Sequence, residues 1–187
     1  VEGVTTGDRS LLRYTQRLLG YALTGEVSCR SLFILWGVGC NGKSSIVNIM
    51  ESIMGPMFTA ISESVMINRE RRGGATPELI PLITARLAVF SESESGAKLN
   101  STRIKNLTGS DKISARQLYG KQITFRPQAK LFMMTNHLPD FDFRDRAMVD
   151  RVRLIPFKAR FAVTPENTRF VDSLRKEHLS EVFSWIV

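Results

Sequence analysis

The sequence predicts an α/β fold whose central sheet is largely parallel. Short, continuously apolar runs, such as residues 31–36 and 86–90, are typical of strands that are buried on both faces. Segments with helical periodicity alternate with these runs, which is the order expected of a parallel sheet flanked by helices. A length of 187 residues with 43% apolar side chains suits one domain with a substantial core and excludes wholesale disorder.

The first half of the chain is predicted to place a strand between two helices. Asp8 can cap a helix over residues 8–23, in which leucines recur at helical spacing. Residues 31–36 form the strand that follows. The second helix is expected over residues 44–54, because Gly55 and Pro56 stop it.

The second half adds three more strands, a hairpin and a helical tail. Strands are expected at 86–90, 131–135 and 152–157. Residues 113–125 form two extended runs around Tyr119-Gly120-Lys121, which predicts a β-hairpin projecting from the sheet. We divide the chain into an N-terminal helical segment (1–30), a core (31–160) and a C-terminal helical tail from 161 to 187.

The positive charge is concentrated in the second half. The formal net charge is +8, yet residues 1–95 are neutral in sum, and residues 98–130 hold eight basic side chains against one acid. Such a stretch predicts contact with a polyanion, and the plainer alternative is a solvated surface. No apolar run is long enough to span a bilayer, and two cysteines make neither a disulfide framework nor a zinc site.

A glycine-rich loop follows the first strand. Residues 37–44 read GVGCNGKS and fit the pattern G-x-x-x-x-G-K-[ST], between a predicted strand and a predicted helix. Glycines let backbone N–H groups converge on phosphate oxygens at a helix N-terminus. The pattern therefore predicts a nucleoside triphosphate site, with Lys43 on the β- and γ-phosphates and the Ser44 hydroxyl on Mg²⁺. The loop residues expected to bind nucleotide are Gly37, Gly39, Asn41, Gly42, Lys43, Ser44 and Ser45.

Acidic residues follow the strand at 86–90. Glu92 and Glu94 have the same parity along an extended chain, so both are able to face the crevice at the carboxyl end of the sheet. We expect Glu92 to hold Mg²⁺ and Glu94 to activate water, with the reverse assignment left open. An exposed turn is the alternative for this segment.

Later polar residues complete the candidate site. Asn136 follows the strand at 131–135, where it is either a turn former or a partner of the γ-phosphate and the attacking water. Arginines at 144, 146, 151 and 153 include candidates for a finger reaching a neighbouring subunit's γ-phosphate, and spacing alone does not choose among them. In the hairpin, Tyr119 is placed to stack on bases. Phosphate contacts are expected from the basic residues Lys112, Arg116, Lys121 and Arg126.

In this order, the motifs resemble the superfamily 3 helicases, in particular the primase–helicases of poxviruses, other large DNA viruses, phages and plasmids. The resemblance covers roughly residues 7–160 and rests on LGYALTG (19–25), GVGCNGKSS (37–45), RLAVFSE (86–92), KNLTGSD (105–111) with ARQLY (115–119), KLFMMTNHLP (130–139) and RVRLIPF (151–157).

The resemblance implies an AAA+-type P-loop NTPase that forms a homo-oligomeric ring, expected to be a hexamer, with ATP at subunit interfaces and single-stranded or forked DNA in its channel. It implies that Asn136 is the sensor, Arg151 the finger, and Lys105 with the hairpin tip the DNA contacts. Two departures from the family pattern keep alternatives open: Ser93 separates the two acids, and residues 149–150 leave Arg146 or Arg153 possible as the finger. A primase domain is expected upstream, and the place of action is expected to be the host cytoplasm or a viral replication site.

Three functions are consistent with these sequence features. The first is an ATP-hydrolysing replicative DNA helicase motor. The second is a DNA-binding scaffold subunit that uses nucleotide only to assemble, without unwinding. The third, a small-molecule P-loop kinase, is disfavoured by the basic stretch at 98–130.

Overall fold

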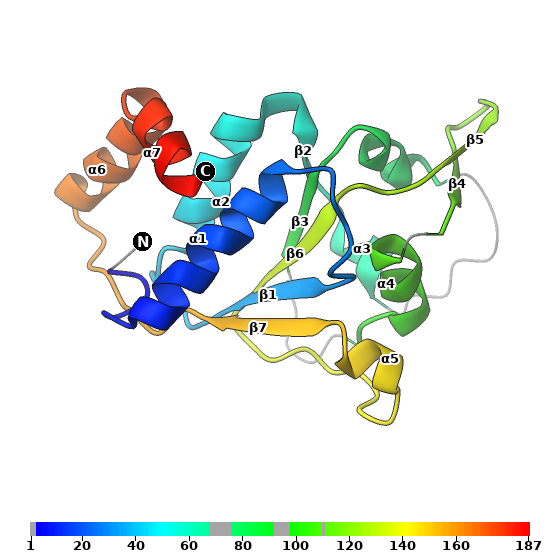
Figure 1. Cartoon of the computed structure of the whole chain (residues 1–187), viewed down its shortest axis with the longest axis horizontal. Helices are drawn as coiled ribbons and strands as arrows, with labels where there is room; N and C mark the ends of the chain where they lie inside the picture. Colours follow the sequence, from blue (N-terminus) through cyan, green and yellow to red (C-terminus); the bar gives the residue numbers. More distant parts are fainter. Residues whose placement is uncertain (1–2, 68–75, 92–97, 110) are drawn as a thin grey trace.

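Five parallel strands form the sheet at the centre of the fold (Figure 1). The computed structural model describes residues 3–67, 76–91, 98–109 and 111–187. The order across the sheet is β2-β3-β6-β1-β7, and every neighbouring pair is parallel. The strands are β1 (Leu32–Trp36), β2 (Phe58–Ala60), β3 (Leu87–Ser91), β6 (Lys130–Thr135) and β7 (Val152–Pro156). The predicted α/β class and its four strands are confirmed, while the short edge strand β2 was not predicted.

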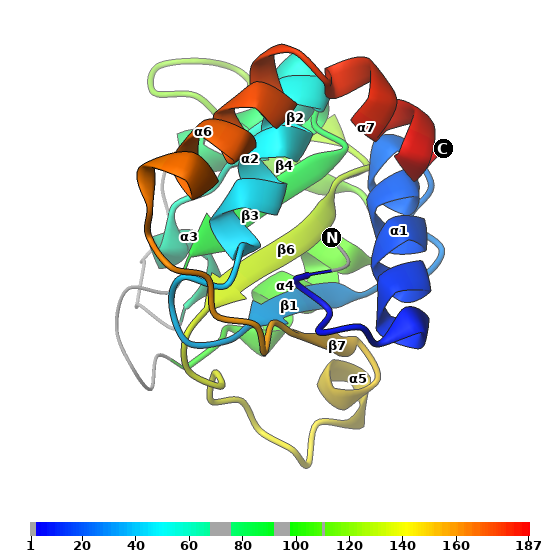
Figure 2. The same ribbon diagram turned by 90° about the vertical axis from the view of Figure 1, so that its left-hand side faces the viewer.

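Helices cover both faces of the sheet (Figures 1 and 2). Against one face lie α1 (Arg9–Leu23), α2 (Lys43–Met54) and α7 (Leu179–Ile186), and the short 3₁₀ helix η1 (Gly55–Met57) continues α2. Helix α6 (Pro165–Lys176) packs outside them, on α2 and α7. Against the other lie α3 (Glu63–Met66), the 3₁₀ helix η2 (Pro77–Ile83), α4 (Ser101–Thr108) and α5 (Arg146–Val149).

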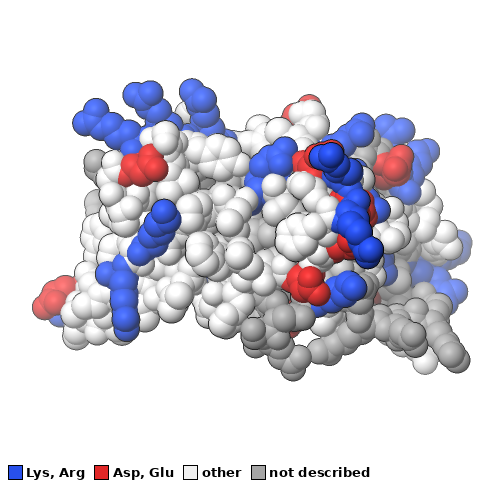
Figure 3. All heavy atoms as spheres, turned by 90° about the horizontal axis from the view of Figure 1, so that it is seen from below, with Lys and Arg blue, Asp and Glu red and all other residues white. Residues whose placement is uncertain are grey.

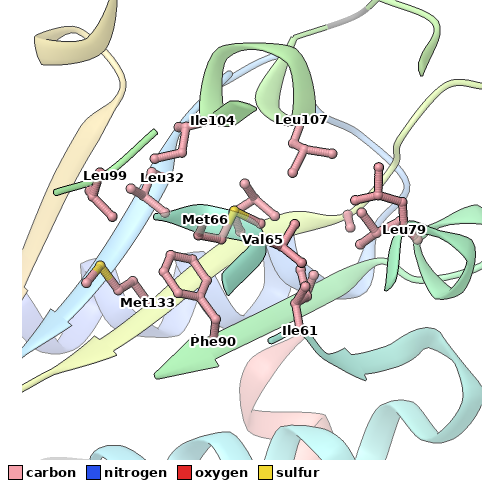
Figure 4. Packing of buried hydrophobic residues seen from close by; sticks show 14 of the residues in the cluster. Leu32, Ile61, Val65, Met66, Leu79, Phe90, Leu99, Ile104, Leu107 and Met133 are labelled. Atoms are coloured by element: carbon pink, nitrogen blue, oxygen red, sulfur yellow. The ribbon is translucent and has the colours of Figure 1, made fainter. Parts of the chain in front are cut away.

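Alternation along the strands divides the core into two clusters. Leu32 and Ile34 of β1 pack towards α3, α4 and η2, whereas Phe33 and Leu35 pack towards α1, α2 and α7. Figure 4 shows the first cluster, in which residues of α4 meet those of β1, β3 and β6. Both faces of the strands are therefore apolar, which explains the continuous apolar runs in the sequence.

The first helix begins where the sequence predicts. The Asp8 carboxylate accepts hydrogen bonds from the backbone N–H of Leu11 and from the hydroxyl and the backbone N–H of Ser10, and these bonds lower the pKa of Asp8. At Gly20 a β-carbon would lie 2.9 Å from the Ile186 carbonyl oxygen, so this glycine lets α7 approach α1 closely.

The predicted hairpin is present and projects from the body of the molecule (Figure 1). Strands β4 (Ile113–Arg116) and β5 (Gln122–Phe125) pair antiparallel around a tip at residues 117–121. The tip carries Tyr119 with its side chain fully exposed and its φ at 58°, in the left-handed region. An aromatic residue held there makes no contribution to the core, so its role lies at the surface.

The N-terminal segment (1–30) and the C-terminal tail (161–187) both pack on the core segment (31–160). Residues of α1 and α7 share one apolar cluster with α2 and β1, and α6 contacts α2. The divisions at residues 30 and 160 stay predictions. Among the described residues, none of the helices has the length and apolar character needed to cross a membrane.

Candidate nucleotide-binding site

The glycine-rich loop joins the carboxyl end of β1 to the start of α2, as predicted. A β-carbon at Gly37 would lie 2.2 Å from the Phe157 carbonyl oxygen, so only glycine fits there. Gly42 adopts a φ of 88° and begins α2 without a side-chain cap. The backbone N–H of Lys43, the first residue of α2, donates to Asn41 Oδ1 at 3.5 Å, and the N-cap Gly42 has no side chain to cap the N–H groups that follow, which leaves them available to an anion.

The Lys43 side chain crosses the loop instead of extending into solvent. Its ammonium group donates to the Gly37 carbonyl, to Asn41 Oδ1 at 3.2 Å and to Asn136 Oδ1 at 3.1 Å. The residue is only 6% exposed, and burial lowers its pKa. A buried cation held by neutral oxygens gains most from an anionic partner, which phosphate groups provide.

Asn41 holds the loop closed from inside. Its amide donates to the Val38 carbonyl at 2.9 Å and to the Phe157 carbonyl at 3.2 Å, and the residue is 2% exposed. The backbone N–H of Phe161 donates to the Cys40 carbonyl at 2.7 Å. The segment after β7 thus forms the back wall of the loop. No motif in the sequence indicates this contribution, because it comes from backbone groups.

A cavity of about 370 Å³ lies in front of the loop. It is lined by loop residues from Gly39 to Ser45, by Ser91 at the end of β3, and by Met134, Thr135 and Asn136 at the end of β6. β6 lies between β1 and β3, so the carboxyl ends of these three strands meet at one edge. The structure brings Lys43, Ser44, Ser45 and Asn136 together there, and Ser91 and Thr135 are lining residues that were not predicted.

The two predicted acids lie outside the described residues. Glu92 follows Ser91 directly in the sequence and Glu94 comes two residues later, and Ser91 lines the cavity. Within the described part of the chain, no group of three or more His, Cys, Asp or Glu side chains is placed to hold a metal ion. The roles of Glu92 and Glu94 therefore stay predictions.

Arg151 lies at the opposite end of the sheet from the loop. Its carbonyl accepts from the backbone N–H of Leu32, the first residue of β1, at 2.9 Å. β1 has five residues and spans roughly 16 Å at about 3.3 Å per residue, so Arg151 cannot reach the cavity of its own chain. The alternatives Arg146 and Arg153 are exposed, in α5 and in β7.

The predicted DNA contacts divide into two groups. Arg116, Tyr119 and Lys121 are exposed on the hairpin. Lys105 lies in α4 instead, where its ammonium group pairs with Asp145 at 2.8 Å.

The basic stretch at 98–130 does not form one continuous surface. Lys130 is 3% exposed, donates to the carbonyls of Thr24 and Gln128, and lies over the Tyr21 ring. Seen from below, acidic side chains lie among the basic ones at the right of the molecule, the end that carries α4, α5 and the hairpin (Figure 3). Lys130 therefore takes no part in the predicted contact between this stretch and a polyanion, because its buried side chain packs against Thr24, in the connection between α1 and β1.

The chain is similar in sequence to proteins of large DNA viruses that carry helicase and primase names. It is 31% identical over 179 residues to "Putative helicase L207/L206" of Acanthamoeba polyphaga mimivirus, covering 95% of this chain and 18% of that protein. It is 27% identical over 154 residues to "Primase D5" of Fowlpox virus, covering 80% of this chain and 19% of that protein. The chain thus spans less than a fifth of the length of these relatives, and the predicted resemblance to the helicases and primases of large DNA viruses is confirmed.

A solved structure supports the fold independently. The C terminal region of NrS-1 superposes with a TM-score of 0.72 at 12% identity, covering 95% of this chain and 42% of that one. In the sequence, residues 35–151 match the profile described as "Family of unknown function (DUF5906)". This match includes the loop, the hairpin and the strand that precedes Asn136, and the chain therefore belongs to the DUF5906 family.

Proposed function

We propose that this chain is the ATP-hydrolysing motor of a replicative DNA helicase, acting as a ring on single-stranded DNA. Its relatives carry helicase and primase names, which supports a helicase-like role in replication. The primase part is proposed to lie elsewhere in the whole protein, and the place of action to be the host cytoplasm or a viral replication site.

The observation that carries the proposal is the position of Lys43. Its ammonium group is buried between loop carbonyl and amide oxygens and also reaches Asn136 on the neighbouring strand. Triphosphate oxygens entering the cavity would replace these neutral partners with anionic ones. Lys43 would then neutralise charge on the transferred phosphoryl group, and Asn136 would be freed to orient the attacking water.

The residues at the cavity suit Mg²⁺ bound together with ATP. Ser44 follows Lys43 at the start of α2, and its exposed hydroxyl lies in the cavity wall. Mg²⁺ usually takes one or two protein ligands with the rest from phosphates and water, so Ser44 and Glu92 would suffice. When bound, the ion would neutralise charge on the β- and γ-phosphates. Glu94 would hold the water that attacks.

The arginine required for fast hydrolysis would come from a second copy. Arg151 lies at the amino end of β1, on the far side of the sheet from the cavity of its own chain. An arginine supplied by a neighbour raises the hydrolysis rate by roughly 10³ to 10⁵. This requirement favours a closed ring, in which every cavity receives an Arg151.

Hydrolysis measured with and without single-stranded DNA tests the proposal. We expect DNA to stimulate the ATPase, and Lys43→Ala to abolish it in both conditions. Lys176→Ala, on the exposed face of α6, is the matched lysine control and should behave as wild type. ATPase that single-stranded DNA does not change would contradict the motor. Loss of assembly in Lys43→Ala, in a protein that never separates strands, would support the scaffold alternative.

A further inference from the structure

Helix α4 links the hairpin, which is proposed to contact DNA, to Arg151, which is proposed to serve a neighbour's ATP. Leu107 of α4 lies in the same apolar cluster as Ala115 of β4, and Ile113 of β4 packs against that cluster, so α4 and the hairpin share packing. The same helix contacts α5, which ends at Val149, two residues before Arg151. A displacement of the hairpin is therefore able to reach Arg151 through α4.

The first link between these helices is an ion pair. Lys105 Nζ lies 2.8 Å from Asp145 Oδ2, and this hydrogen bond is the main cause that lowers the pKa of Asp145. The other carboxylate oxygen of Asp145 accepts from the Met148 backbone N–H at 3.2 Å and caps α5. Lys105 thus keeps Asp145, the N-cap residue of α5, in position.

The second link reaches the guanidinium group itself. Thr108 is 4% exposed, and its hydroxyl donates to the Ile104 carbonyl at 2.7 Å while it accepts from Arg151 Nε at 3.2 Å. Arg151 Nη1 donates to the Ala147 carbonyl in α5. Within the described residues the second terminal nitrogen, Nη2, has no hydrogen-bond partner, so one edge of the group is left for an anion.

We propose that Lys105 and Thr108 are positioning residues that orient Arg151 and couple it to the DNA hairpin. The inference rests on the proposed function, since it assigns these residues to the arginine that serves a neighbour's ATP. It gives Lys105 a role in an intramolecular ion pair rather than on a DNA phosphate. The physical basis is a continuous chain of contacts through α4, from the hairpin to the guanidinium group.

Variants at Thr108 test the link to Arg151. Thr108→Val keeps the shape and removes the hydroxyl, and we expect kcat in the presence of single-stranded DNA to fall by about three- to thirtyfold with KM for ATP unchanged. Thr108→Ser keeps the hydroxyl and should retain most of the rate. Equal rates for the two variants would overturn the assignment.

Variants at Lys105 separate positioning from DNA contact. We expect Lys105→Ala to lower DNA-stimulated kcat while the salt dependence of DNA binding stays as in wild type, and Lys105→Arg to restore the rate. A salt slope reduced by about one would instead place Lys105 on a phosphate and overturn the proposal.

A double-mutant cycle covers the case in which Thr108→Val does not fold. Asp145→Asn keeps the oxygen that caps α5 and removes the charge, so its effect on kcat should not add to that of Lys105→Ala. Additive losses would overturn the proposal. A wild-type protein without DNA stimulation would refute the proposed function itself, whereas a stimulated wild type with unaffected variants would refute only the coupling.

Discussion

At the residue scale, two buried polar side chains each join two chain segments that are far apart in the sequence. Asn41 ties the glycine-rich loop to the segment after β7, and Lys130 ties the start of β6 to the connection after α1. Each satisfies backbone carbonyls that have no strand partner there. Removal of the Asn41 side chain leaves the buried Phe157 carbonyl without this donor, and a buried acceptor left without a partner costs more free energy than a typical hydrogen bond contributes.

Asn41→Ala should destabilise the protein by about 1–3 kcal/mol, because the Val38 and Phe157 carbonyls lose their donor. The loosened loop should also bind ATP roughly tenfold more weakly. Urea unfolding and equilibrium nucleotide binding measure the two effects. Asn106→Ala, on the exposed surface of α4, is the control, and equal unfolding free energies for the two variants would contradict this role.

Lys130 predicts a pH dependence of stability. Burial is the main cause that lowers its pKa from 10.5 to about 8, so between these values the unfolded chain binds a proton that the folded chain does not. The free energy of unfolding should therefore rise with pH from about 8, by up to about 1.4 kcal/mol per pH unit for this group. Lys43, whose pKa burial also lowers, contributes in the same direction.

Tyr21 reverses the trend at higher pH. Burial raises its pKa from 10.0 to about 12, so above 10 the unfolded chain loses a proton that the folded chain keeps, and stability falls. Measuring the free energy of unfolding from pH 7 to 10 isolates the contributions of Lys130 and Lys43. Lys130→Met should reduce the upward slope, and an unchanged slope in that variant would show that Lys130 does not cause it.

At the element scale, the hairpin is separate from the core on most of its surface. Its tip is exposed, and only Ile113, Ala115 and Phe125 contact the apolar cluster beneath. Substitutions at the tip should therefore change binding without changing stability.

Lys121→Ala should weaken binding to single-stranded DNA and reduce the slope of log affinity against log salt by about one, because one phosphate contact is lost. Tyr119→Ala should weaken it through loss of stacking, by about 1–3 kcal/mol. The free energy of unfolding of both variants should lie within about 0.5 kcal/mol of the wild-type value. Lys176→Ala is the control for a general effect of charge, and a slope that Lys121→Ala leaves unchanged would remove the hairpin from the DNA interface.

The elements that the sequence predicts are those with a strong local pattern. The cap at Asp8, the apolar strands and the loop at 37–44 all carry such a pattern, and each is found. The strand β2 has three residues and the helix α5 has four, which is too short for periodicity to show. The backbone groups of Phe157 and Phe161 behind the loop, and the pairing of Lys105 with Asp145, depend on tertiary contacts that no local pattern reveals.

At the scale of the whole molecule, the fold separates the two groups that hydrolysis would require. Lys43 lies at the carboxyl end of β1, and Arg151 at its amino end. Under the proposed function, a single chain would therefore supply Lys43 to one nucleotide site and Arg151 to another. This arrangement is the reason for proposing a ring rather than a monomeric ATPase.

Mixing two inactive variants tests this claim most directly. Lys43→Ala removes the phosphate-binding lysine, and Arg151→Ala removes the arginine, so neither protein alone should hydrolyse ATP at the wild-type rate. In mixed assemblies some interfaces would combine an intact Lys43 from one copy with an intact Arg151 from another. If Arg151 acts on a neighbour's ATP, hydrolysis in the presence of single-stranded DNA should be partly recovered on mixing, whereas a rate equal to the average of the two separate variants would rule out this role of Arg151.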